Sequence, residues 1–182
     1  FGKAEMWSEL REMLLAAGGQ RTGKVSLMLS DDEAQTIAIA GSDRSDTIFF
    51  TGVDGSHEGA KVGPGALGLR IKAGRIPGSR SACDVIAYPV FSPPTQSPIP
   101  ELEVRVKQRE FAFTAAAFGL NMTPGDFVYL GPRQHVSDLT ELGGLFFSNP
   151  KGSLFFNEAA RKPPELKPAV RVFLLVCTRI DD

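Results

Sequence analysis

Residues 67–90, LGLRIKAGRIPGSRSACDVIAYPV, decide the fold of this chain. Apolar and polar residues alternate with a period of two over residues 67–72, which is typical of a strand with one buried face. The sequence Ile76-Pro77-Gly78-Ser79 then predicts a turn, and residues 82–90 predict a second strand. This stretch therefore predicts a β-hairpin within a β-rich fold.

The same alternation extends the β-rich pattern in both directions along the chain. We predict further strands at residues 25–29, 37–39, 48–50, 102–107, 111–117, 127–130 and 169–180. The first three would form a meander of hairpins. The last strand is apolar on both faces, so we expect it to be central and covered on both sides.

Residues 3–17 predict an amphipathic helix. Apolar residues recur there at three- and four-residue spacing, namely Met6, Trp7, Leu10, Met13, Leu14 and Ala17. Charged residues fill the opposite face, and Gly18-Gly19 provides a stop signal.

These elements predict one mainly β domain over residues 1–182, at the margin of the α+β class. We expect a two-sheet β-sandwich of about 8–10 mostly antiparallel strands, with the helix packed on the sheet that holds the last strand. Residues 92–100 contain four prolines and predict a stiff connector that crosses between sheets.

Composition argues against two classes of partner. Twenty basic and 21 acidic residues give a net charge of −1, which offers no general attraction to nucleic acid. The longest apolar run, residues 172–177, is far shorter than the ~20 residues of a membrane span, so we expect no membrane insertion. Arg70 and Lys72 would form a basic stripe only if their strand paired with the one at residues 102–107.

Two cysteines, Cys83 and Cys177, lie in predicted strands. They could form one disulfide, or they could be two buried free thiols, and the sequence leaves both open.

No motif demands a cofactor, a metal ion or a catalytic residue. Residues 63–68 match G-x-G-x-x-G, but a strand pattern follows where dinucleotide binding needs a helix. The acids at residues 31–33, 43 and 46 fit polar turns and lack a calcium-loop pattern.

The leading hypothesis for function is a non-enzymatic module that acts by protein–protein contact or self-association, as a structural or assembly component. Its candidate contact residues are Trp7 and Met13 in the helix and Phe146, Phe147 and Phe155 in a predicted Phe-rich hairpin over residues 145–156.

Two alternatives stay open. The first is a small-molecule or carbohydrate-binding domain that uses loops at residues 54–65 and 131–138, with candidate residues His57, Glu58, Arg133 and His135. The second is a hydrolase or metal enzyme built on the same two histidines and nearby acids.

Overall fold

The computed structural model describes residues 1–19, 21, 23–31, 33–79, 81–94, 110–133, 138–148 and 170–180. Within these residues the chain is mainly β, as the sequence predicts, and its paired strands are antiparallel. The predicted strand at residues 102–107 and most of the proline-rich connector lie outside the described residues.

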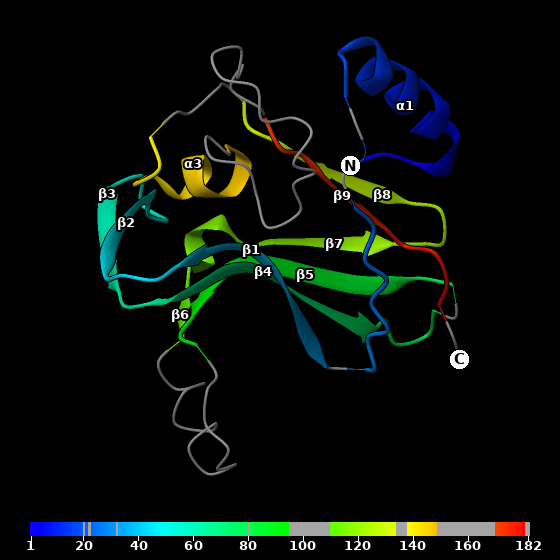
Figure 1. The fold of residues 1–182 in the computed structure, drawn as a ribbon. Helices are drawn as coiled ribbons and strands as arrows, with labels where there is room; N and C mark the ends of the chain where they lie inside the picture. Colours follow the sequence, from blue (N-terminus) through cyan, green and yellow to red (C-terminus); the bar gives the residue numbers. More distant parts are fainter. Residues whose placement is uncertain are drawn as a thin grey trace.

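The largest sheet in the described part of the chain has five strands (Figure 1). Its order is β1 (Ala34–Ser42), β4 (Gly65–Arg75) and β5 (Cys83–Ser92), with β6 (Phe111–Ala112) and β7 (Phe118–Met122) sharing the far edge of β5. The hairpin at residues 67–90 is confirmed, because β4 and β5 pair along their full length around a turn at Gly78. We call this five-stranded sheet the main sheet.

A second hairpin, β2 (Asp46–Thr51) and β3 (His57–Val62), forms an excursion between β1 and β4. Ser42 lies opposite Gly65, so β1 pairs with β4 and not with β2. The predicted meander and the predicted loop at residues 54–65 are therefore wrong. Ala60 and Val62 are buried in the core, and this burial outweighs the weak strand propensity of the glycine and charged residues around them.

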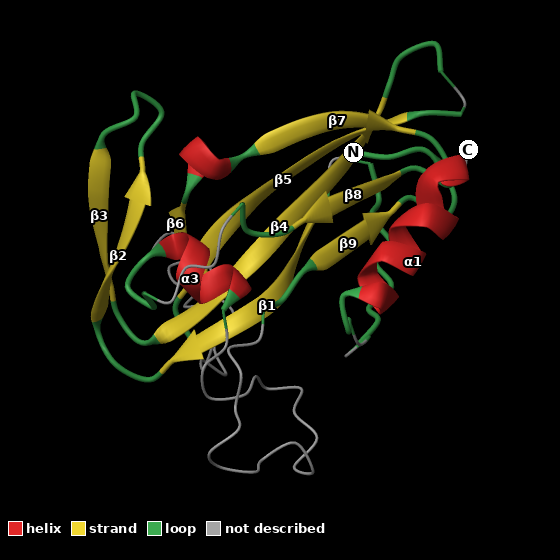
Figure 2. Ribbon diagram, turned by 90° about the horizontal axis from the view of Figure 1, so that it is seen from above, coloured by secondary structure: helices red, strands yellow, loops and turns green. Residues whose placement is uncertain are grey.

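One face of the main sheet is covered by β8 (Phe127–Leu130), β9 (Phe173–Val176) and the short helix α3 (Leu142–Phe147) (Figures 1 and 2). The core lies between these layers and includes Ile39, Leu67, Leu69, Ile71, Val85, Phe91, Val128, Leu142 and Phe146. Among the described residues, β8 and β9 pair only with each other, so the covering layer mixes a small sheet with a helix.

The Phe-rich stretch is helical where we predicted the first strand of a hairpin. Leu142 and Phe146 are buried and four residues apart, so they lie on the same face of α3 and point into the core. The second half of the predicted hairpin lies outside the described residues.

Two other predicted strands differ from the structure. Residues 25–29 have no strand partner, although Leu27 and Leu29 pack against the core while Val25 and Met28 are exposed. The strand at residues 111–117 breaks after Ala112, because the fully buried Phe113 leads into a 3-10 helix at Thr114–Ala116. Extended segments with the right alternation do not form strands unless a neighbouring edge is free to pair with them.

Candidate functional site

The N-terminal segment is attached to β8 by backbone pairing. Gly2 and Phe127 exchange two hydrogen bonds, with N···O distances of 2.9 and 3.0 Å. The position of Gly2 requires glycine, because a Cβ atom there would overlap the ring of Phe127. Residues 2 and 127 thus fix where the N-terminal helix leaves the domain.

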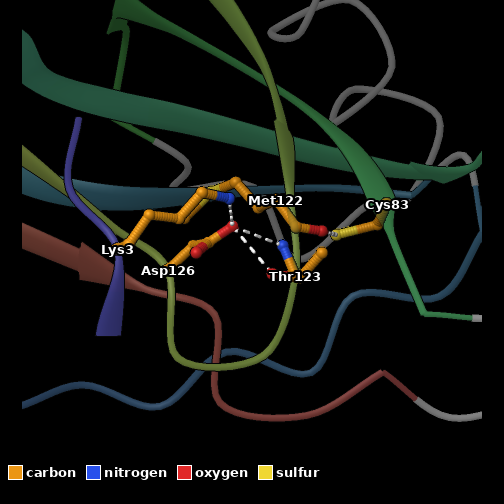
Figure 3. A network of polar contacts seen from close by, with 5 residues as sticks. All are labelled: Lys3, Cys83, Met122, Thr123 and Asp126. Carbon is orange, nitrogen blue, oxygen red and sulfur yellow. Dashed lines mark hydrogen bonds and ion pairs between the residues drawn. The ribbon is translucent and has the colours of Figure 1, made fainter. Parts of the chain in front are cut away.

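An ion pair reinforces this attachment (Figure 3). The Nζ of Lys3 donates to Oδ2 of Asp126 at 2.9 Å, and the Asp126 side chain is buried. The same oxygen accepts from the backbone N and the hydroxyl of Thr123, both at 2.9 Å. Because all three donors converge on one buried carboxylate, we call residues 123–127 the docking turn.

Local sequence explains the shape of the docking turn. Thr123-Pro124-Gly125-Asp126 closes with a bond from the N of Asp126 to the O of Thr123, and Gly125 has a φ of +93°, which favours glycine. The hydrogen bonds from the Thr123 backbone and from Lys3 hold the pKa of Asp126 below its ordinary value of 3.8. The carboxylate is therefore charged at neutral pH.

The helix α1 (Trp7–Ala16) continues from a 3-10 turn at Ala4–Met6. It ends at Ala16, two residues before Gly18, whose φ of +77° favours glycine, as the glycine pair predicts. The helix lies beside β8 and β9, the sheet that contains the predicted last strand (Figure 2). The ring of Trp7 packs edge-on against Phe127 with centroids 5.7 Å apart.

We call residues 2–6, which lead into α1, the helix root. An apolar cleft of about 240 Å³ opens between the helix root and the β8–β9 sheet. Its lining is almost entirely apolar and consists of Ala4, Trp7, Gly125, Phe127 and Val176. Val176 is 46% exposed, so β9 faces the core on one side and this half-covered cleft on the other. The expectation of a last strand fully covered on both sides is therefore wrong.

Most of α1 is uncovered. None of its ten residues is buried by the described chain, and only Leu10 and Leu14 are half-buried. Met6, Trp7, Met13 and Leu15 are 40–59% exposed. Trp7 and Met13, two of the predicted contact residues, thus lie on an accessible helix that is held at its root.

The other predicted contact residues do not form a surface with them. Phe146 is 4% exposed and packs edge-on against Phe147 and Phe173, so it belongs to the core. Phe147 is half-buried and packs against the same cluster. Phe155 lies outside the described residues. The aromatic residues of α3 stabilise the fold and offer little to a partner.

The candidate ligand residues are only partly brought together. His57 stacks on Phe49 with centroids 5.3 Å apart, and its Nε2 lies 3.7 Å from Oε1 of Glu141. Glu58 accepts a hydrogen bond from Ser56. Arg133 is exposed, and the described residues show no bond between it and His57 or Glu58. His135 lies outside the described residues.

The remaining charged candidates have structural partners. Arg70 binds both carboxylate oxygens of Glu110 at 2.7 and 2.9 Å, so its charge is balanced within the fold. Asp31 accepts a hydrogen bond from the backbone N of Arg75, and Asp46 accepts one from the backbone N of Thr47. The G-x-G-x-x-G stretch runs into β4, and no group of three potential metal-ligating side chains gathers within the described residues. Nor does any described helix have the length and apolar content needed to cross a bilayer.

Sequence reasoning missed the residues that hold the helix root. The turn at residues 123–126 has a clear signal, but nothing local relates it to Gly2 or Lys3, which lie more than 120 residues away. A lysine next to a glycine carries no information about such a distant partner. Comparisons with protein-family models, curated proteins and solved structures found no match.

Proposed function

We propose that this chain is a protein-contact module whose recognition element is α1. The observation that carries the proposal is the contrast between a firmly attached helix root and an uncovered helix body. The segment before α1 is fixed by two backbone bonds and an ion pair with the buried Asp126, whereas α1 itself contributes no buried residue to the described part of the domain.

Helix length supports this view. Isolated helices shorter than about 12–15 residues are marginal in water, and α1 has ten residues. Its apolar residues exceed what β8 and β9 cover, because Met13 is 56% and Leu15 59% exposed. A partner that buried them would gain on the order of 25 cal/mol per Å² of apolar surface.

Charge indicates the chemistry of the partner. Glu5, Glu9 and Glu12 follow one another at four- and three-residue spacing and are all exposed. Glu9 lies three residues after Met6 and four before Met13, so it neighbours both on the helix surface. An acidic stripe thus runs beside the exposed methionines, and it complements an amphipathic segment whose apolar residues are flanked by Lys or Arg.

Trp7 provides the test, because it is the only tryptophan in the chain. The full chain would be titrated with a designed amphipathic helix of about 18 Leu and Lys residues, long enough to be helical. We expect saturable binding with a shift of Trp7 emission to shorter wavelength, weakening as salt is added. A peptide with Glu in place of each Lys is the matched probe and should not bind.

Variants locate the contact. Met13→Glu should weaken binding at least about tenfold, equivalent to about 1.4 kcal/mol. Ser8→Glu is the matched control, since it adds a negative charge at an exposed position of α1 that lies about 140° around the helix from Met13. Equal binding of the two peptides, or equal effects of the two variants, would contradict the proposal.

Light scattering tests whether α1 binds a second copy of this chain instead of a basic partner. A monomeric chain at micromolar concentration is the expected result. A dimer that Met13→Glu dissociates would show that α1 recognises another copy of this chain, and it would replace the basic segment as the partner.

A further inference from the structure

The two cysteines of the chain meet across the two layers of the fold. Cys83 is the first residue of β5 in the main sheet, and Cys177 directly follows β9 in the covering layer. They are 94 positions apart in sequence, yet both pack against the same apolar core. Each is partly exposed and neither is in a disulfide.

Both cysteines are attached to the strand end and turn at residues 122–126, and Figure 3 shows Cys83 on the Met122 side. Cys83 lies opposite Met122 in the ladder, and its thiol donates to the carbonyl of Met122 at 3.7 Å. Cys177 is bonded to the other side of the turn, with its N donating to Asp126 at 3.0 Å and its O accepting from Gly125 at 2.7 Å. Cys83 and Cys177 thus flank the same turn, and each affects the pKa of the other's thiol.

We propose that Cys83 and Cys177 are a redox-active thiol pair that forms an intramolecular disulfide by exchange with a small disulfide such as oxidised glutathione. One thiolate attacks the small disulfide, which releases one small thiolate and leaves a mixed disulfide on the protein. The second cysteine then loses its proton and attacks the protein-bound sulfur, releasing the second small thiolate. The two cysteines are oxidised, and one disulfide is reduced to two thiols.

The surroundings indicate which sulfur attacks first. Burial raises the pKa of both thiols, and for Cys177 the nearby Cys83 adds to this effect, bringing its pKa to about 11. Cys177 acts in the opposite direction on the pKa of Cys83 and favours its thiolate. Cys83 is therefore the attacking residue and Cys177 the one that completes the bond, and exchange speeds up as pH rises above neutrality.

The disulfide would link the two layers of the fold covalently. It would join the main sheet to the end of β9, next to the turn that holds the helix root. It would close a loop of nearly a hundred residues, which removes conformational freedom from the unfolded chain.

The test uses the full chain with oxidised glutathione, mass spectrometry of the intact protein and peptide mapping without reduction. We expect the loss of two hydrogens, a peptide pair joined through Cys83 and Cys177, and a Tm raised on the order of 10 °C and restored by reduction. Cys83→Ser and Cys177→Ser should each stop at one glutathione adduct, with no such rise in Tm.

Three outcomes would overturn the proposal. One is a stable glutathione adduct on both cysteines of the unaltered chain. Another is a disulfide that joins two chains, seen as a dimer on a non-reducing gel. The third is an unaltered intact mass after incubation at pH 8.5 under conditions in which both thiols react with iodoacetamide.

Discussion

Gly2 and Phe127 face each other as a closely paired antiparallel bridge, and the ring of Phe127 fills the space that a side chain at residue 2 would need. This relationship makes one glycine responsible for the position of the N-terminal helix. Phe127 in turn contacts Trp7, so any change at residue 2 is reported by the environment of the tryptophan.

Gly2→Ala should detach the helix root. The added Cβ overlaps the Phe127 ring, and relieving such overpacking costs about 1–3 kcal/mol. We expect acrylamide to quench Trp7 fluorescence more strongly in this variant than in the unaltered chain. Gly23→Ala is the matched control, because nothing lies within 4 Å of a Cβ at that position. Identical quenching in the two variants would show that Gly2 does not hold the helix.

Asp126 should make stability depend on pH in the acid range. Its pKa in the folded chain lies below the ordinary 3.8, so the unfolded chain binds the proton more readily. The stabilisation is fully present above about pH 5 and is lost as pH falls through 3.8 and below. Urea unfolding at a series of pH values should show this decline.

Asp126→Asn should flatten that decline. The amide oxygen can still accept from Thr123, but the ion pair with Lys3 is lost. The variant should therefore be less stable than the unaltered chain at pH 7, and the difference should shrink toward pH 3. If the difference in stability between the two chains stayed constant across this range, Asp126 would stabilise the fold through its shape and not through its charge.

Arg70→Lys should destabilise the main sheet by about 1–2 kcal/mol, because lysine cannot reproduce the two-pronged bond to Glu110 and the bond to Thr36. The side chains of Arg70 and Glu110 are only 22% and 17% exposed, so added salt should change the loss little. Arg75→Lys, on an exposed position at the end of β4, should have almost no effect. The free energies of unfolding of the two variants, measured with a chemical denaturant in low and high salt, test this.

Phe146→Ala should cost about 3–5 kcal/mol, the loss expected for a buried phenylalanine. Phe147→Ala should cost less than half as much, since that ring is only half-buried. Thermal unfolding of both variants tests whether α3 serves the core. If Phe146→Ala kept its Tm and lost only partner binding, the assignment of Phe146 to the core would be wrong.

The contrast between α1 and α3 illustrates what could be predicted from this sequence. The helix at residues 7–16 has apolar residues at helical spacing and a glycine stop, both local signals, and it forms where predicted. The run Leu145-Phe146-Phe147 has no local signal that distinguishes a strand from a helix turn. Its state is decided by Leu142 and Phe146, which reach the core together only in a helix.

Pairing partners were harder to predict than strands. Residues 37–39 and 48–50 are strands as expected, but β1 pairs with β4, which begins 23 residues after β1 ends, because the β2–β3 excursion intervenes. In the candidate site, too, local features could be predicted and long-range contacts could not. Its exposed residues, Trp7 and Met13, were identified from helical periodicity, whereas Lys3 and Asp126 are joined only by the completed fold.

The docking of the helix root also fixes an order of events during synthesis. Asp126 follows Lys3 by 123 residues, which a ribosome adds in roughly 6 to 25 seconds at about 5–20 residues per second. For most of that interval α1 has been synthesised and the docking turn has not. Trp7 cannot yet pack on Phe127 during that period, so the nascent chain exposes this ring to chaperones before its own partner residue exists.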